Sequence, residues 1–185
     1  MKRPLRYYGD PVLRQPARRI EQVDEPLRAF AHDMIETMHA ESGIGLAAQQ
    51  VGETVALCVV DVPERMDIGA GGEPLNPSVE MPLVLMNPEI VSASDVLECA
   101  EEGCLSFPDI ATPIRRPEEI EVAYLGLDGV RTAVRLRGLV ARAVQHEMDH
   151  LAGRLIVDHM TPVKKVAYSG RLKRLRRRTQ EALTA

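Results

Sequence analysis

The sequence lacks a long apolar run, paired cysteines and any low-complexity tract. Its longest apolar runs, Val55–Val60 and Pro82–Met86, have the length of a strand and fall far short of the roughly 20 residues that span a bilayer. The first seven residues lack the apolar stretch of a signal peptide. Three cysteines cannot all pair with one another, which argues against a secreted disulfide scaffold. We therefore expect a cytoplasmic protein without a membrane partner.

Composition and charge indicate one compact domain with a distinct tail. Hydrophobic residues make up 45% of the 185 residues and charged residues 27%, which is typical of a globular domain. Residues 161–185 carry eight basic side chains and one acid, a net +7, so the overall −4 leaves −11 for residues 1–160. A basic tail on an acidic body suggests a polyanionic partner, although a solvated terminal helix has the same composition. We divide the chain into a domain of residues 1–160 and a basic helical extension of residues 161–185.

Apolar periodicity predicts one helix before a region of strands. The helix follows Asp24 and Pro26, and its apolar side chains recur every three or four residues until Ser42. Between Pro63 and Pro82, frequent glycine and proline predict a flexible surface loop. The predicted strands and turns are residues 55–60, residues 82–86 with a turn at Asn87-Pro88, residues 120–124, a hairpin tip at Asp128-Gly129, and residues 130–136.

A second helix begins at Leu139 and is apolar over most of its surface. Only Arg142, Gln145 and Asp149 form a polar stripe, so the helix must be largely buried. Thr161 and Pro162 start the basic terminal helix. Strands flanked by helices, rather than alternating with them, predict an α+β fold. We expect a single domain with antiparallel sheets packed around the buried helix, plus a C-terminal basic helix.

The buried helix contains His146-Glu147-Met148-Asp149-His150, an HExxH motif. Histidines four residues apart project from one helical face, so both imidazoles can bind one divalent ion. Glu147 also avoids the polar stripe, and burying its carboxylate is costly unless a metal and its water compensate. A chance HExxH would sit on a solvated helix, whereas this helix is apolar. The motif therefore predicts a metal site.

A third ligand is not obvious downstream of the motif. The extended HExxHxxGxxH pattern of one protease class keeps Gly153 here but ends at Ile156, which cannot bind metal. The only downstream glutamate is Glu181, at the far end of the tail, while Asp158 and His159 would have to fold back on a short loop. These observations favour an upstream ligand over a metalloprotease arrangement.

Cysteine is the outstanding candidate for that upstream ligand. Cys104 follows Gly103, which allows close approach of the backbone to a ligand. Cys58 lies within an apolar strand, where it is explained as a small core residue, and Cys99 lacks the neighbouring glycine. A Cys-His-His set leaves one metal position open for water, as hydrolysis requires.

The segment Gly43–Gln50 combines small residues with an amide. A dinucleotide-binding loop is excluded because Ala48 replaces the third glycine and the segment follows a helix. No Lys-Ser or Lys-Thr pair follows, so the segment is not a phosphate-binding loop either. We interpret it as a strand that lines a substrate cleft with its backbone and one side-chain donor.

Together these segments resemble the peptide deformylase family. The family carries GxGLAAxQ, EGCLS and HExDH in that order, and this chain has Gly43–Gln50, Glu102–Ser106 and His146–His150. Residues 8–14 also resemble the family's opening segment, and a basic terminal helix occurs in many bacterial members. The resemblance covers nearly the whole chain, and three motifs in order are highly specific.

The resemblance implies a role for individual residues. It makes Cys104, His146 and His150 the metal ligands and Glu147 the general base and acid. Gln50 and the backbone N–H of Leu105 would stabilise the oxyanion. Substrate would lie against Ile44, Gly45 and Gly103, with Gly45 contacting it through its backbone. Glu102 would support the metal histidines, and Arg116 would support Glu102.

The implied reaction is hydrolysis of the N-formyl group from the N-formylmethionine of nascent polypeptides, which releases formate. Water activated by the ion would attack the formyl carbon, with Glu147 accepting the proton and passing it to the leaving amine. The resemblance implies Fe²⁺, with Zn²⁺ or Ni²⁺ as substitutes. It also implies a monomer that meets the ribosome near the exit tunnel through the basic helix and does not bind DNA.

Two other functions compete with this interpretation. A zinc peptidase is disfavoured by Ile156 and by the missing downstream ligand. A ribosome-binding module with a structural metal would need a fourth protein ligand and would leave Glu147 unexplained. The sequence also departs from the family, because Ala111 replaces an arginine that positions the peptide backbone in some members. Arg142 and Ala100 replace larger apolar side chains of the methionine pocket, so these departures concern substrate binding rather than the chemistry.

Overall fold

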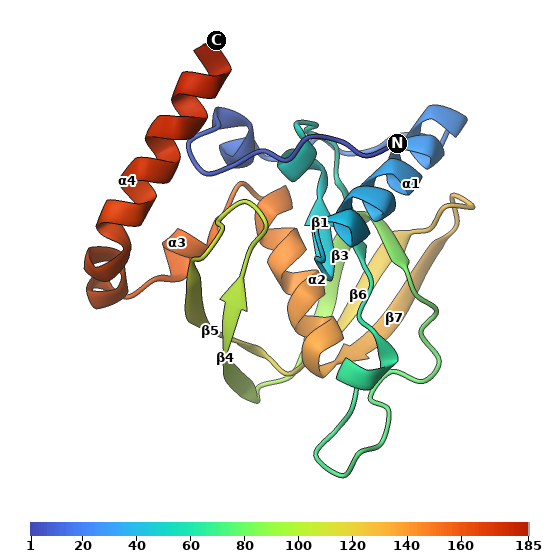
Figure 1. Ribbon diagram of the computed structural model, residues 1–185. Helices are drawn as coiled ribbons and strands as arrows, with labels where there is room; N and C mark the ends of the chain where they lie inside the picture. Colours follow the sequence, from blue (N-terminus) through green and yellow to red (C-terminus); the bar gives the residue numbers. More distant parts are fainter. Residues whose placement is uncertain (185) are drawn as a thin grey trace.

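The computed structural model describes residues 1–184, which form one antiparallel sheet, a separate strand pair and four α-helices (Figure 1). The helical elements are η1 (Pro11–Arg14), α1 (Glu25–Ala40), η2 (Ala48–Val51), η3 (Glu64–Met66), α2 (Gly138–Leu151), α3 (Ile156–His159) and α4 (Pro162–Thr184). The strands are β1 (Gly45–Ala47), β2 (Leu57–Val60), β3 (Leu83–Ala93), β4 (Leu97–Gly103), β5 (Ala111–Pro117), β6 (Glu119–Leu125) and β7 (Arg131–Arg137). The predicted α+β class is confirmed.

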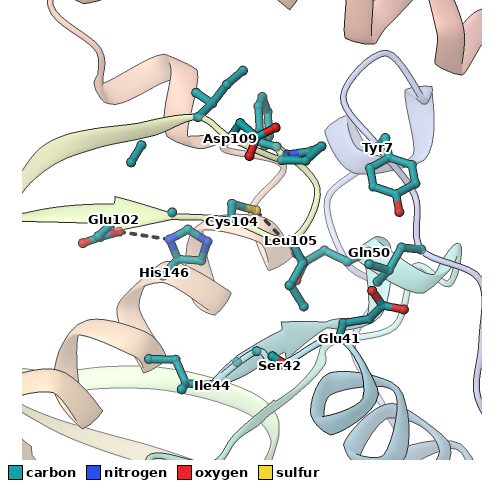
Figure 2. A pocket seen from close by; sticks show the side chains of 18 of the residues that line it. Tyr7, Glu41, Ser42, Ile44, Gln50, Glu102, Cys104, Leu105, Asp109 and His146 are labelled. Atoms are coloured by element: carbon teal, nitrogen blue, oxygen red, sulfur yellow. Dashed lines mark hydrogen bonds and ion pairs between the residues drawn. The ribbon is translucent and has the colours of Figure 1, made fainter. Parts of the chain in front are cut away.

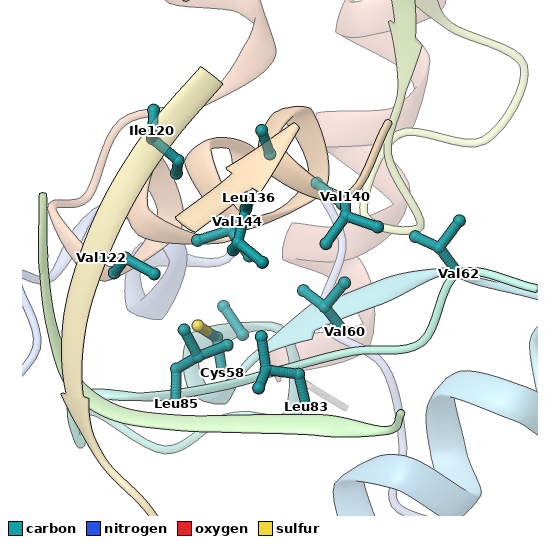
Figure 3. Close-up of a cluster of buried hydrophobic side chains, with 13 residues drawn as sticks. Cys58, Val60, Val62, Leu83, Leu85, Ile120, Val122, Leu136, Val140 and Val144 are labelled. Carbon is teal, nitrogen blue, oxygen red and sulfur yellow. The ribbon is translucent and has the colours of Figure 1, made fainter. Parts of the chain in front are cut away.

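The larger sheet has the strand order β1-β2-β3-β6-β7, with every neighbouring pair antiparallel. Strand β2 is buried on both faces, which explains why its sequence is continuously apolar rather than alternating. Cys58 and Val60 pack with α2, while Leu57 and Val59 pack with α1. The two helices therefore cover opposite faces of the sheet, and Figure 3 shows the cluster on the α2 side.

Strands β4 and β5 form the second, two-stranded sheet, which lies beside α2 (Figure 1). A third core cluster connects this sheet to the C-terminal part of the chain. It contains buried Phe107, Ile110 and Ile114 together with apolar residues of η1 and α3, and Tyr168 and Leu172 of α4 pack against it. Helix α2 is consequently enclosed between the two sheets, as the sequence predicted.

Most predicted elements are confirmed, with one clear error. Helix α1 begins after Asp24, whose side chain accepts from the Leu27 N–H (3.0 Å), and α4 begins after Thr161, whose hydroxyl accepts from Lys164. The turn predicted at Asn87-Pro88 is wrong, because β3 continues through it to Ala93 with a local shift of register. Asn87 has a positive φ of 49°, and its side-chain amide bonds both backbone groups of Ile20 at 2.8 Å.

The predicted hairpin and the glycine-rich loop are both present. The hairpin joins β6 to β7, with Gly129 in the left-handed region at φ 77°. The loop between β2 and β3 contains only the short helix η3. Its buried Asn76 exchanges hydrogen bonds with the backbone of Arg137, and Asp67 accepts from Asn76, so the loop is attached to the end of β7.

The polar stripe of α2 is not a solvent-facing surface. Arg142, Gln145 and Asp149 are all buried, and their polar atoms bond partners on β4, β5 and the segment after α2. Helix α2 is therefore buried on its polar side as well as its apolar side. None of the helices within residues 1–184 is long and apolar enough to cross a membrane.

Candidate metal centre and active site

Three potential metal ligands meet where the end of β4 approaches α2. Cys104 follows β4 directly, and His146 and His150 lie one turn apart on α2. One ligand atom from each lies within 4.8 Å of the other two. Cys104 Sγ is 3.2 Å from His150 Nε2, and the two imidazole rings lie edge to face with centroids 5.1 Å apart. The structure thus brings together three residues separated by 46 positions of sequence.

The charge environment of this cluster fits a cation. Burial alone would lower the pKa of His146, yet hydrogen bonds with Cys104 and Glu102 raise it well above its ordinary value. Burial and the charge of His146 lower the pKa of His150 well below its ordinary value. A thiolate and two imidazoles are also the donor set of hydrolytic zinc and iron sites with an open position, so the residues fit a divalent ion.

The carboxylate of Glu147 lies at the same site and has no ion-pair partner within residues 1–184. Its Oε2 atom is buried without a hydrogen-bond partner there. Burial raises the pKa of Glu147 to about 7, and the nearby charges of Glu102 and Asp149 contribute in the same direction. A group with that pKa can accept and return a proton near neutral pH.

Gly45 of β1 is required by the position of this carboxylate. A Cβ atom on Gly45 would lie 2.3 Å from Glu147 Oε1, well inside van der Waals contact. The glycine therefore leaves room for the carboxylate and exposes the β1 backbone beside it. The sequence predicted a cleft-lining strand here, and the structure explains why its first residue has no side chain.

Glu102 is buried beside the ligand cluster and accepts hydrogen bonds from three side chains. Arg116 donates to both carboxylate oxygens (2.6 and 2.8 Å), and His146 Nδ1 lies 2.9 Å from Oε2. Burial alone would raise the pKa of Glu102, but the bonds from Arg116 and His146 lower it to about 2. Glu102 thus remains ionised and fixes the orientation of His146, leaving Nε2 directed toward the cluster.

Two members of this network were not assigned a site role from the sequence. Arg142 donates to Glu102 Oε1 (2.8 Å) and to the Ile114 carbonyl (2.9 Å). Asp149 accepts from Arg116 on the opposite side (2.9 Å). From the sequence, Asp149 was recognised only as a polar position of α2, and Arg142 was in addition placed at the methionine pocket, without a role beside Glu102. Their spacing of seven residues, which places them on one helical face, was the available signal.

Two hydrogen-bond donors lie close to the cluster in sequence or in space, on separate elements that line the same cavity. The Gln50 side chain on η2 is fixed because its oxygen accepts from the Ala47 N–H (2.8 Å). Its nitrogen then points to Cys104 Sγ (3.5 Å) and Ser106 Oγ (3.3 Å). The backbone N–H of Leu105 donates to no acceptor within residues 1–184. These donors can bind an oxygen atom held near the cluster.

The N-terminal segment holds the two donor-bearing elements together. The Arg6 N–H donates to the Gln50 carbonyl (2.8 Å), and the Tyr8 N–H donates to the Ser106 carbonyl (3.0 Å). Residues 6–8 therefore lie between η2 and the segment that follows Cys104. The sequence indicated only that residues 8–14 resemble the family's opening segment and assigned them no contact with the site.

These groups surround one end of a cavity of about 950 Å³ (Figure 2). Ile44, Gly45 and Gly103 line it, as do Gln50, Leu105, Cys104 and His146, whereas His150 lies behind the wall and is not among its lining residues. Ala111 and Arg142 line it as well, so the departures from the family pattern at these two positions lie at the cavity wall. The cavity also receives residues of α4, which the sequence placed outside the domain.

The competing ligands lie elsewhere. Cys58 is fully buried in the core cluster between β2 and α2, and Cys99 is exposed on β4. Asp158 pairs with Arg14, and His159 Nε2 lies 2.9 Å from Asp149, so neither belongs to the group of potential metal ligands. Gly153 ends α2 at φ 71°, where a Cβ would meet the Arg14 carbonyl, so it serves the helix end.

Comparison with known proteins matches this geometry to one family. The model of the family described as polypeptide deformylase matches residues 2–166. The chain belongs to the peptide deformylase family. A peptide deformylase of Brucella suis is 40% identical over 173 residues, covering 94% of this chain and 93% of its relative. One of Microchaete diplosiphon is 46% identical over 156 residues, covering 84% and 78%.

Solved structures of the family share the fold. Peptide deformylase from Ehrlichia chaffeensis superposes with a TM-score of 0.85 at 34% identity, covering 96% of this chain and 98% of that one. The same enzyme in complex with actinonin gives a TM-score of 0.83 at 34% identity, covering 94% and 96%. Peptide deformylase from Thermotoga maritima gives 0.75 at 40% identity, covering 88% and 99%.

Proposed function

We propose that this chain is a metal-dependent hydrolase that removes the formyl group from N-formylmethionine at the start of nascent polypeptides. The observation that carries the proposal is the unpartnered, buried carboxylate of Glu147 beside the Cys104-His146-His150 cluster. A structural metal site would have no use for that carboxylate, whereas hydrolysis of an amide needs a proton acceptor next to the ion. The reaction belongs to co-translational processing of N-terminal methionine in protein biosynthesis.

Cys104, His146 and His150 are proposed to hold the ion, and Fe²⁺ is the proposed metal, with Zn²⁺ or Ni²⁺ as substitutes. When bound, such an ion acts as a Lewis acid and brings the pKa of water towards neutrality. A thiolate ligand donates charge to the ion and is itself open to oxidation. These properties support anaerobic handling of the Fe²⁺ form.

Glu147 moves the proton in the proposed mechanism. Its carboxylate accepts a proton from the attacking water and later delivers that proton to the leaving amine, so it ends the cycle unchanged. Its raised pKa suits both transfers, since a carboxylate with an ordinary pKa would be a weaker base and a poorer proton carrier near neutral pH.

Developing negative charge on the formyl oxygen is proposed to be stabilised by the Gln50 amide and the Leu105 N–H. Both donors are in place before substrate arrives, so little reorganisation is needed. Ile44, Gly45 and Gly103 are proposed to contact the peptide, Gly45 through its backbone. Glu102 and Arg116 are proposed to support the ligand His146.

We further propose that the protein is a cytoplasmic monomer with no DNA or membrane partner. Residues 1–160 are proposed to form the catalytic domain, and the basic extension of residues 161–185 to meet the ribosome near the exit tunnel. The eight basic side chains of the extension support this proposal, because ribosomal RNA is the polyanion nearest to a nascent chain.

The test is release of formate from formyl-Met-Ala-Ser by anaerobically purified Fe²⁺ protein. We expect formate and Met-Ala-Ser as the only products, with each peptide bond left intact. Cleavage between the amino acids would identify a zinc peptidase instead. If the peptide is recovered unchanged although one ion is bound per chain, the result would favour a non-catalytic metal module.

A further inference from the structure

Helix α4 is attached to the domain by specific contacts rather than extending freely from it. Tyr168 and Leu172 pack against the cluster that contains Phe107 and Ile110. Arg171 donates to the Asp109 carbonyl (2.9 Å), and Lys164 Nζ lies 3.6 Å from Glu101. The helix also approaches the N-terminal segment, where a Cβ on Gly9 would lie 2.9 Å from the Arg176 backbone. These contacts hold one face of α4 against the mouth of the cavity.

The face of α4 that is turned inward forms part of the cavity wall. Its lining residues recur every three or four positions, as expected for one helical face: Tyr168, Leu175, Arg178, Thr179 and Ala182. The opposite end of the same cavity is lined by His146 and Glu147. A substrate whose formyl group lies at Glu147 therefore occupies a cavity that α4 helps to enclose.

A second cavity, of about 550 Å³, continues from the first along α4. Pro108, Asp109 and Ile110 line one side of it, and the helix lines the other with Arg171, Arg174, Leu175 and Arg178. Leu175 and Arg178 line both cavities, so the two hollows are contiguous at these side chains. The combined groove runs from the metal cluster to three arginines.

The charge along this groove changes from balanced to positive. In the larger cavity, Glu41 pairs with Lys2 (2.7 Å), Glu101 with Lys164, and Glu102 with Arg142. At the outer end Asp109 is the single acid, against Arg171, Arg174 and Arg178. Neither Arg174 nor Arg178 has an ion-pair partner within residues 1–184. The two guanidinium groups are therefore available to a ligand.

We propose that the inner face of α4 is the outer wall of the peptide-binding groove and that Arg174 and Arg178 select acidic side chains downstream of the formylmethionine. This inference rests on the proposed function and adds a substrate class to it. A peptide is favoured over RNA as the ligand of these two arginines because Arg178 lines the same cavity as Glu147. Lys165 and Lys173 of the same helix are exposed and line neither cavity, so they remain open to a polyanion.

The test compares formyl-Met-Ala peptides that continue with three aspartates, three serines or three lysines. For the wild type at low ionic strength, we expect kcat/KM to be about tenfold higher for the aspartate than for the lysine peptide, because two unpaired guanidinium groups attract one sequence and repel the other. The ratio should shrink at about 0.5 M salt, which screens exposed charges.

Variants assign the selectivity to the two side chains. Arg174→Ala/Arg178→Ala should bring the aspartate-to-lysine ratio near one, and Arg174→Glu/Arg178→Glu should invert it. The matched control, Arg176→Ala/Arg177→Ala, removes the same charge from the same helix at positions that line neither cavity, and it should keep the wild-type ratio. Inversion by the Glu variant also excludes a general loss of folding as the cause.

The outcomes separate this inference from the proposed function. Formate released from all three peptides at one rate, or a ratio that the Arg174→Ala/Arg178→Ala variant leaves unchanged, would overturn the role of α4 while retaining the hydrolase. Loss of ribosome binding in that variant without a change in the peptide ratio would assign the arginines to RNA and also overturn it. Absence of formate from every peptide would instead contradict the proposed function itself.

Discussion

The properties of Glu147 depend on a hydrogen-bond partner that is missing among the described residues and on the missing side chain of Gly45. Its carboxylate is buried, one of its oxygens has no partner within residues 1–184, and the space for the other exists only because residue 45 is a glycine. A buried carboxylate without compensation is costly, and its pKa rises to about 7 as a result. The stability given up at this position maintains a proton acceptor next to the ligand cluster.

The substitution Glu147→Gln tests the proton transfer directly. The side chain keeps its size but can no longer accept a proton, so we expect kcat to fall by about 10²-fold or more. The content of bound ion, measured by elemental analysis, should remain at one per chain. Activity above about 1% of wild type in an ion-loaded variant would assign the base to another group.

The substitution Gly45→Ala tests the position of the same carboxylate without altering it. The added methyl group would lie 2.3 Å from Glu147 Oε1, so the carboxylate must move. We expect kcat to fall by about tenfold to a hundredfold, since small displacements of catalytic groups have effects of this size. Ion content should be unchanged because the three ligands are untouched. A variant with wild-type kcat would show that the carboxylate tolerates displacement.

At the scale of elements, β4 and α2 are connected by a buried network of charges. Glu102, on β4, binds Arg116 of β5 as well as His146 and Arg142 of α2. Asp149 also binds Arg116, so α2 contacts this network through three residues, Arg142, His146 and Asp149, which are spread over about two helical turns. The two-stranded sheet of β4 and β5 is thereby fixed relative to the helix that carries two of the candidate ligands.

This network should make stability depend on pH in acid. The pKa of Glu102 is about 2 in the folded protein against an ordinary value of 4.5, so the ionised group stabilises the fold above pH 4.5 and this contribution is lost as pH falls towards 2. Relative to Glu102→Gln, the wild type should lose about 2–3 kcal/mol of unfolding free energy over that range. Urea unfolding with the ion chelated measures this difference, and a pH-independent difference would contradict the assignment.

The elements also show where sequence reasoning succeeds and where it ends. The HExxH spacing predicted two candidate ligands because helical periodicity alone places them on one face, and the structure brings both together with Cys104. Periodicity could not show that Arg142 and Asp149 are buried. A polar stripe on a helix has the same sequence pattern whether it is exposed to solvent or buried against charged side chains of another element. Asn87-Pro88 has the composition of a turn, but the side chain of Asn87 binds the backbone of Ile20 and the strand continues. Such long-range partners leave no local signal.

At the scale of the whole molecule, α4 has two chemically different faces. The inward face has apolar residues that pack on the domain and arginines that line the groove. Lys165 and Lys173, which we call the outward face, are exposed and line neither cavity. The net charge of residues 161–185 distinguished the tail from the rest of the chain in the sequence. It could not separate an inward from an outward face, because these faces depend on how the helix packs against the domain. The two proposed ligands of the helix, a peptide and ribosomal RNA, therefore use separate surfaces.

The outward face provides the test of ribosome binding. Lys165→Glu/Lys173→Glu reverses two charges and should weaken cosedimentation with ribosomes by about tenfold or more, because contacts to phosphate dominate such binding. The weakening should be greatest at low salt. Formate release from formyl-Met-Ala serves as the check on folding. Cosedimentation equal to that of the wild type across the salt range would remove the outward face from the proposed contact.

The hydrogen bonds from Arg6 and Tyr8 to Gln50 and Ser106 also bear on how the chain acquires its structure. They join positions about 44 and 98 residues apart, and closure of such long loops is entropically unfavourable until other contacts form. The donors on η2 and after β4 are therefore expected to be aligned late in folding. Amide hydrogen exchange at Arg6 and Tyr8 would report this alignment. If these two amides exchange faster than those of the core, the N-terminal segment opens locally, and the cavity can widen while the sheet remains folded.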